Sequence, residues 1–103
     1  MRTLTECFDR KVRLTDERLA HICEHPELAG MELEIEEVLR NPQFVRPSRS
    51  DDTVRLFYGF YSETVVGSKW LCVVVKYEEA DSFVVTAYLT NKPKAGEDLW
   101  PKK

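Results

Sequence analysis

The stretch that decides the fold is WLCVVVKY, residues 70–77, which is almost wholly apolar and rich in β-branched side chains. Such a run is typical of a strand covered on both faces, so we expect the central strand of a sheet here. On either side, residues 54–61 and 83–90 alternate with a period of two, which predicts two more strands. The short polar links at 62–68 and 78–82 predict antiparallel hairpins between the three strands.

The alternation assigns faces to the outer two strands. In residues 54–61 both alternating sets contain large aromatic side chains, so both faces of that strand are expected to be covered. Residues 83–90 separate into an apolar set and a more polar set, which should point to opposite faces of the sheet. The apolar set, expected to meet the helices, is Phe83, Val85, Ala87 and Leu89, and the other set is Val84, Thr86, Tyr88 and Thr90.

The first half of the chain carries the signals of a hairpin and two helices. Residues 4–14 predict a hairpin with its turn at 9–11. Thr15 is a good N-cap for a helix that runs to about residue 24, because Pro26 disfavours helical geometry in the residue before it. Apolar spacing predicts a second helix at 31–40, followed by a strand at 44–49.

These elements predict an α+β fold, with two N-terminal helices packed on an antiparallel sheet of four or more strands. At 103 residues, with 43% hydrophobic and 32% charged side chains, the chain is expected to form one domain over residues 1–103. The expected parts are an N-terminal hairpin or arm at 1–14, helices at 15–41, the antiparallel sheet at 43–90 and a loosely held C-terminal arm at 91–103.

Composition also limits the compartment and the partners. No apolar run approaches the roughly 20 residues that span a bilayer, and the N-terminus lacks the apolar stretch of a signal peptide. The three cysteines are Cys7, Cys23 and Cys72. They form neither a zinc pattern nor a disulfide framework, which fits reduced thiols in a reducing compartment. We therefore expect a cytoplasmic protein without a membrane partner.

The net charge of −3 argues against simple nonspecific binding of nucleic acid. The charge is unevenly distributed, because residues 15–40 hold two basic and eight acidic side chains. Residues 44–76 hold five basic and three acidic side chains. A local cationic groove in the sheet is compatible with this distribution.

Both histidines of the chain, His21 and His25, lie four residues apart in a segment expected to be helical. With Glu24 they match the HxxEH pattern of inverted zinc proteases. That chemistry needs a third ligand and a helix that continues through the second histidine, whereas Pro26 ends this one and no third ligand is evident. We therefore expect no metal and no cofactor. Two interpretations stay open: ordinary surface histidines, or an acid–base site.

An acid–base site needs partners, and the predicted strands supply candidates. Thr86 and Tyr88 share one face of the last strand, while Lys76 and Arg55 lie on the two strands before it. A histidine that moves a proton, cations that stabilise a phosphate and hydroxyls that position it form a set suited to phosphoryl chemistry. The candidate proton-transfer group is His21.

Several motifs occur in a fixed order: RLAHIxxHPE at 18–27, IxxVLxxP at 35–42, residues 70–76, and VVTAY at 84–88. Together they resemble small uncharacterised domains of cyanobacterial and phage type in the barnase–EndoU–colicin–RelE-like group of ribonucleases. The resemblance covers residues 12–90. It implies an α+β fold in which helices precede a curved antiparallel sheet, as in RelE and barnase.

The resemblance also implies a metal-independent ribonuclease, with RNA and an antitoxin-like protein as partners. In that chemistry a base activates the ribose 2′-OH, which attacks phosphorus to form a cyclic phosphate. By position, the catalytic residues would be His21, with Arg55 or Lys76, and Thr86 with Tyr88. We expect further binding contacts from His25, Tyr58 and Trp70.

A different class of function is also open. The second and third predicted strands carry more aromatic side chains than a small core needs. They could form a non-catalytic surface for a protein partner or for a homodimer. The aromatic residues concerned are Phe57, Tyr58, Phe60, Tyr61 and Trp70.

Overall fold

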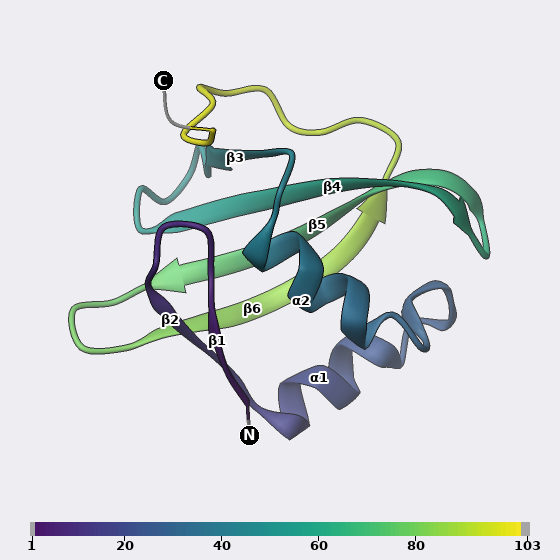
Figure 1. The fold of residues 1–103 in the computed structure, drawn as a ribbon, viewed down its shortest axis with the longest axis horizontal. Coiled ribbons are helices and arrows are strands. Elements are labelled where there is room, and N and C mark those ends of the chain that lie inside the picture. The colour runs from purple at the N-terminus through teal and green to yellow at the C-terminus, as the bar shows by residue number, and fades with distance from the viewer. Residues whose placement is uncertain (1, 102–103) are drawn as a thin grey trace.

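The computed structural model describes residues 2–101 and contains one sheet, two α-helices and a short 3-10 helix (Figure 1). In the sheet the strands lie in the order β1-β2-β6-β5-β4-β3. The elements in chain order are β1 (Arg2–Thr5), β2 (Lys11–Leu14), α1 (Asp16–Cys23), η1 (Pro26–Leu28), α2 (Glu32–Arg40), β3 (Phe44–Pro47), β4 (Val54–Thr64), β5 (Gly67–Tyr77) and β6 (Ser82–Thr90).

The predicted central strand is confirmed, because β5 lies between β4 and β6 and pairs with both in antiparallel register. The hairpins predicted on each side of it are present. The link predicted at 62–68 is mostly strand, since β4 and β5 continue towards a tight turn at Val65 and Val66. Residues 61–69 of this hairpin extend past the last paired residue of β6 (Figure 1).

The predicted fold of two N-terminal helices on an antiparallel sheet is wrong in two respects. The predicted α+β class matches only roughly, because most of the fold is sheet. The chain begins with strands β1 and β2, so the helices are not N-terminal. The sheet is mixed, since β2 pairs with β6 in parallel, with Arg13 opposite Phe83. The physical reason is burial: Val12 and Leu14 are 0% and 1% exposed, and an isolated hairpin could not bury them.

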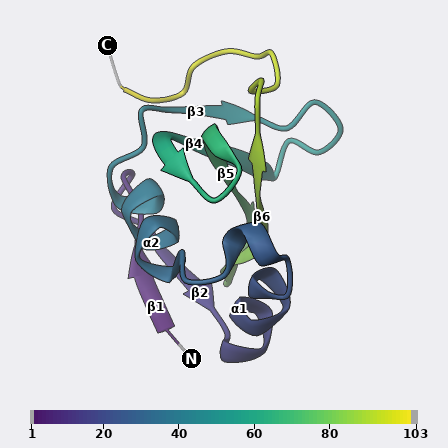
Figure 2. The same cartoon turned by 90° about the vertical axis from the view of Figure 1, so that its right-hand side faces the viewer.

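Apolar side chains form a core on one face of the sheet and a smaller cluster on the other. The larger core joins Ile22 of α1 and the α2 side chains Ile35, Val38 and Leu39 to the sheet residues Phe57, Leu71, Val73 and Val75. In this core α1 lies against β6 and α2 lies against β5 (Figure 2). The smaller cluster contains Leu56, Tyr58 and Cys72. The prediction that β4 is covered on both faces is confirmed, because Phe57 and Tyr58 are both fully buried.

A β-bulge in β6 corrects the predicted faces of that strand. Val74 pairs with Thr86 but Val75 pairs with Val84, so Val85 is the extra residue. The bulge reverses the alternation on its N-terminal side. Val84 therefore joins Ala87 in the larger core instead of Val85.

Local signals set the helix limits as predicted. The Thr15 side chain accepts a hydrogen bond from the Arg18 backbone N–H at 3.0 Å and caps α1. Helix α1 ends at Cys23, and Pro26 begins the 3-10 helix η1. Helix α2 ends at Arg40, just before Asn41-Pro42.

The C-terminal segment is anchored rather than loosely held, as far as residue 101. The Lys94 backbone N–H donates to the Tyr58 hydroxyl at 3.0 Å, and the Leu99 N–H donates to the Val45 carbonyl at 2.7 Å. The Trp100 ring meets the Phe8 ring edge to face, with centroids 5.6 Å apart. The last two positions of the predicted arm, 102 and 103, lie outside the described residues, as does residue 1.

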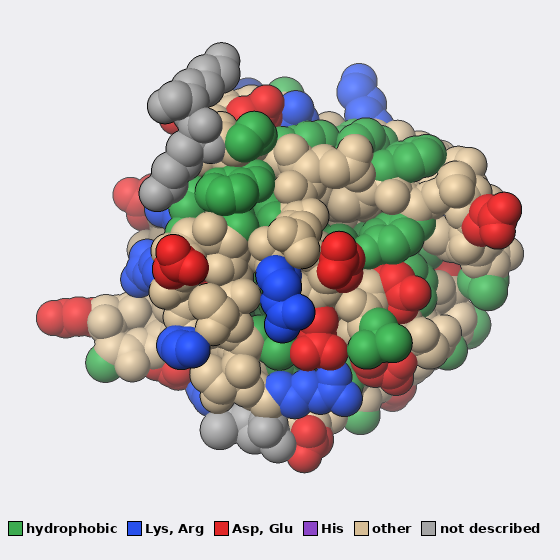
Figure 3. Space-filling model, viewed as in Figure 1, with side chains coloured by type: hydrophobic (Ala, Val, Ile, Leu, Met, Phe, Trp, Pro, Cys, Tyr) green, Lys and Arg blue, Asp and Glu red, His purple; other side chains and the backbone are tan. Residues whose placement is uncertain are grey.

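Acidic and basic side chains are interspersed over the face drawn in Figure 3. Several form ion pairs, including Arg2 with Glu36 at 3.2 Å. No helix in residues 2–101 is long and apolar enough to cross a membrane.

Candidate functional site

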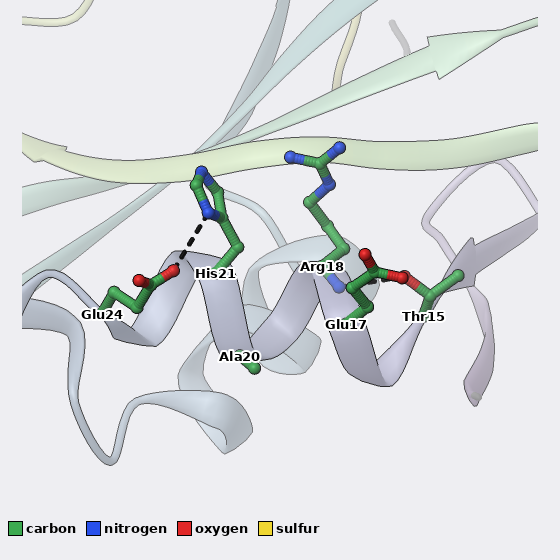
Figure 4. Close-up of a pocket in the computed structure, with 6 residues that line it drawn as sticks. All are labelled: Thr15, Glu17, Arg18, Ala20, His21 and Glu24. Atoms are coloured by element: carbon green, nitrogen blue, oxygen red, sulfur yellow. Dashed lines mark hydrogen bonds and ion pairs between the residues drawn. The ribbon is translucent and has the colours of Figure 1, made fainter.

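A surface depression of about 690 Å³ lies along one face of α1. Four of its lining residues, Thr15, Arg18, His21 and Glu24, follow one another at intervals of three (Figure 4). Side chains three apart are neighbours on a helix surface. Capping of α1 by Thr15 therefore aligns an arginine, a histidine and a glutamate on one exposed face.

His21 and Glu24 form the polar contact at the centre of this depression. The Nδ1 atom of His21 lies 3.0 Å from Oε2 of Glu24, and the side chains are 64% and 72% exposed. A carboxylate at Nδ1 fixes the orientation of the ring and leaves Nε2 available to exchange a proton. A histidine that a carboxylate holds at one ring nitrogen can act as a general base through the other.

Arg18 places a positive charge beside His21. Both side chains extend from α1 towards β6 (Figure 4). Arg18 also lines a second, smaller depression of about 230 Å³ with Arg13, Phe83 and Val84. Two guanidinium groups therefore lie along the junction of α1 and β6, and that of Arg13 already pairs with Asp81 at 2.6 Å.

His25 lies outside this depression. It follows the end of α1, with extended backbone angles, and its Nδ1 lies 3.7 Å from Oε1 of Glu27. Its side chain is 64% exposed, the same fraction as His21. The two histidines are therefore alike in exposure and in having a carboxylate partner, but they do not share a site.

Three of the predicted catalytic residues lie together on the face of the sheet that carries the smaller apolar cluster. Thr86 is opposite Val74 and Tyr88 is opposite Cys72, so both point away from the larger core. Lys76 follows Val74 by two residues and shares that face. Its Nζ is 3.1 Å from Oδ2 of Asp51.

Arg55 lies on the other face, opposite Val75 of the larger core. Arg55 and Lys76 therefore cannot serve one site from the same side of the sheet. Among residues 2–101, no hydrogen bond or ion pair joins His21 to Arg55, Lys76, Thr86 or Tyr88, and none of these four residues lines the α1 depression. The catalytic set expected from the sequence therefore stays a prediction. Of its residues, only Lys76, Thr86 and Tyr88 lie on the same face of the sheet.

The predicted binding residues Tyr58 and Trp70 belong to the smaller apolar cluster. Tyr58 is 0% exposed, so it packs inside the protein. Trp70 is partly buried between the rings of Phe44 and Phe60, with centroids 5.1 and 5.2 Å away. Of these aromatic rings, Phe60 offers the most surface, at 43% exposed.

Burial keeps Tyr88 and its neighbour Cys72 protonated at neutral pH. Desolvation raises the pKa of the Cys72 thiol to about 11. Desolvation and a hydrogen bond with Cys72 raise the pKa of Tyr88 well above its usual range. Tyr88 can therefore donate or accept a hydrogen bond there, but it is not a base near pH 7.

Two members of the α1 depression were given no role by the sequence. Arg18 lies within the RLAHIxxHPE motif, and Glu24 was noted only as part of the zinc pattern. The signal that could have identified them is the three-residue spacing from Thr15. In the described chain, no group of three or more His, Cys, Asp or Glu residues could hold a metal ion.

Comparison with known proteins finds no matching family model, no matching curated protein and no matching solved structure.

Proposed function

We propose that this domain is a metal-independent ribonuclease whose proton-transfer group is His21. The observation that carries the proposal is the 3.0 Å contact between His21 Nδ1 and Glu24, in a depression that Arg18 also lines. When a neighbouring hydroxyl attacks a phosphodiester, the reaction requires a base, a carboxylate that orients the base and a cation such as a guanidinium group. Arg18 and His21 of α1, with Glu24 at its C-cap, supply all three.

In this mechanism Nε2 of His21 removes the proton from a ribose 2′-OH. The 2′ oxygen forms a bond to the adjacent phosphorus while the bond from phosphorus to the 5′ oxygen breaks. The leaving 5′ oxygen takes a proton from water, and the hydroxide that results takes the proton from the His21 imidazolium, which leaves a 2′,3′-cyclic phosphate, a 5′-hydroxyl and the starting form of His21. Arg18 stabilises the charge that develops on the phosphate oxygens, and Glu24 stabilises the protonated imidazole.

Arg55, Lys76, Thr86 and Tyr88 take no part in this proton transfer. RNA remains the proposed substrate and an antitoxin-like protein a proposed partner, with the cytoplasm as the proposed location. The resemblance of the ordered motifs to the barnase–EndoU–colicin–RelE-like group supports these proposals. Reduced cysteines fit the same compartment.

The two histidines provide a matched pair of variants. We expect His21→Ala to lose RNA cleavage in the presence of EDTA, by about 100-fold or more, because general-base catalysis contributes roughly 10²–10⁴-fold. His25→Ala should cleave like the unmodified protein, since His25 has the same exposed fraction but lies outside the depression. Rates on total RNA and on tRNA, measured by gel electrophoresis, check this expectation.

Both variants should keep their melting temperature, because each removes an exposed side chain. Equal loss in the two variants would contradict the assignment of His21. An unmodified protein that cleaves no RNA would contradict the function itself.

A second candidate function is a non-catalytic interaction module that uses the β4–β5 hairpin. The hairpin carries exposed apolar side chains at Phe60, Val65 and Val66, which are 43%, 77% and 51% exposed. Exposed apolar surface of this kind is common where proteins bind one another. Light scattering of the purified protein would favour this candidate if it showed a dimer that Val65→Ser and Val66→Ser together return to a monomer.

A further inference from the structure

A third surface depression, of about 300 Å³ and called the cavity from here on, opens where β5 ends and β4 begins. Arg10, Arg55 and Tyr77 line it. It shares no lining residue with the α1 depression. The two arginines, from the β1–β2 turn and from β4, are called the arginine pair below.

The cavity is backed by a buried carboxylate. Glu6 is 2% exposed, and its Oε1 accepts hydrogen bonds from the backbone N–H groups of Phe8 and Arg10 at 2.7 and 2.9 Å. Its Oε2 accepts a hydrogen bond from the Tyr77 hydroxyl at 2.5 Å. Desolvation and this hydrogen bond raise the pKa of Tyr77 well above its usual range, so the phenol stays a donor. Glu6 and Tyr77 therefore fix the β1–β2 turn against the end of β5.

Aromatic rings orient the arginine pair. The guanidinium carbon of Arg10 lies 4.5 Å from the centre of the Tyr77 ring, and that of Arg55 lies 5.0 Å from the same centre. Arg55 is also 4.7 Å from the centre of the Phe8 ring. A guanidinium group stacked on an aromatic ring is held in place, while the N–H donors at its edge stay available to other partners.

The side chains of the arginine pair have no carboxylate partner among residues 2–101. Arg13 and Arg46, by contrast, form ion pairs with Asp81 and Asp98 at 2.6 and 2.8 Å. The three hydrogen bonds that Glu6 accepts come from two backbone N–H groups and the Tyr77 hydroxyl, not from an arginine side chain. The cavity therefore presents two oriented guanidinium groups whose N–H donors form no hydrogen bond with residues 2–101.

We propose that the arginine pair binds a phosphoryl anion in this cavity. Oriented guanidinium groups match phosphate oxygens in geometry, and such charge-assisted hydrogen bonds are among the strongest in proteins. The site is distinct from the α1 depression, and the proposal stands whether or not the domain cleaves RNA. Exposed carboxylates at the rim, from Asp52, Glu78 and Glu79, repel an anion and should reduce its affinity.

The test is a titration of ¹⁵N-labelled protein, followed through the arginine side-chain signals in NMR spectra. The probes are inorganic phosphate, diethyl phosphate and acetate. We expect phosphate to move the signals of Arg10 and Arg55 to saturation and acetate to bind more weakly. If diethyl phosphate also binds, the site accepts the phosphodiester of a larger ligand. If only inorganic phosphate binds, the ligand is the free anion or a terminal phosphate.

Variants separate binding by the arginine pair from general attraction to positive charge. Arg10→Gln and Arg55→Gln should each weaken phosphate binding by about tenfold or more, since a hydrogen bond to a charged group is worth roughly 1.5–3 kcal/mol. Arg46→Gln is the matched control, because Arg46 also stacks on a ring but is paired with Asp98. It should bind phosphate like the unmodified protein.

Two further variants keep the test decisive if glutamine disturbs the fold. Arg55→Lys retains the charge but not the planar fork, so it should bind phosphate with intermediate affinity. Glu79→Gln removes a rim carboxylate and should tighten binding. Equal binding of acetate, an equal loss in Arg46→Gln, or no movement of the Arg10 and Arg55 signals would overturn the proposal.

Discussion

Among single residues, Asp51 shows how a partly exposed carboxyl group is held in its ionised form. Its Oδ1 accepts hydrogen bonds from the Thr53 hydroxyl at 2.6 Å and from the Thr53 backbone N–H at 2.9 Å, and its Oδ2 pairs with Lys76. These partners, Thr53 foremost, lower the pKa of Asp51 from 3.8 to about 2. The ionised Asp51 carboxylate therefore links the turn between β3 and β4 to Lys76 of β5.

This shift predicts a pH dependence of stability. A carboxyl group whose pKa is lower in the folded state stabilises the fold at pH values above its unfolded pKa of 3.8, and that contribution is lost as pH falls through about 2. Asp51→Asn should therefore be less stable than the unmodified protein at pH 7, with the difference shrinking between about pH 4 and pH 2. Thermal unfolding across this pH range measures the difference.

The neighbouring Asp52→Asn variant is the control, because the Asp52 side chain is exposed and accepts no hydrogen bond from the described residues. It should change stability little at any pH. A constant difference between Asp51→Asn and the unmodified protein from pH 7 to pH 2 would contradict the assignment.

At this scale the sequence identifies some of the candidate functional side chains and not others. His21 could be found because histidine is rare in this chain and its chemistry is distinctive. Glu6, Arg10 and Tyr77 could not be found in this way. Glu6 and Tyr77 are 71 residues apart, and they meet only because the β1–β2 turn packs on the end of β5.

Among the elements, the packing of α2 on β4 depends on a glycine. A Cβ atom added to Gly59 would lie 2.7 Å from Cγ2 of Val38. Neither the strand nor the helix can yield easily, because Val38 is 1% exposed in the core. The close approach of the two elements therefore requires a residue without a side chain at position 59.

Gly59→Ala should destabilise the protein by about 1–3 kcal/mol, the usual cost of overpacking a core. Gly96→Ala is the matched control, since the nearest atom to its added Cβ would be 3.6 Å away, and it should change stability by about 0.5 kcal/mol or less. Urea unfolding measures both. Combining Gly59→Ala with Val38→Ala should cost less than the sum of the two single changes, and strict additivity would contradict the contact.

The elements themselves were largely predictable, but their pairing was not. Polar links beside residues 70–77 predict antiparallel hairpins because such pairing is local. The parallel pairing of β2 with β6 joins Arg13 to Phe83, across most of the chain, and no local pattern encodes it. The bulge at Val85 escaped prediction for a related reason, since an extra residue shifts the period without altering the composition.

For the whole molecule, the mixed sheet distributes the candidate groups over separate places. His21 lies on α1, Lys76 and Thr86 lie on the sheet face with the smaller apolar cluster, and Arg55 lies in the cavity at the end of β5. With a net charge of −3, the proposed affinity for RNA requires local cations such as Arg18, because Arg13 is already paired with Asp81. The sequence predicted the residue types that phosphate chemistry needs, but not which of them share a surface.

The central claim, that His21 activates a ribose 2′-OH, is tested most directly by the products formed from RNA of randomised sequence in EDTA. The proposal predicts fragments that end in 2′,3′-cyclic phosphate and 5′-hydroxyl. It also predicts no cleavage of the same RNA when every 2′-OH is methylated, and none by His21→Ala. Cleavage of the methylated RNA, or undiminished cleavage by His21→Ala, would contradict it.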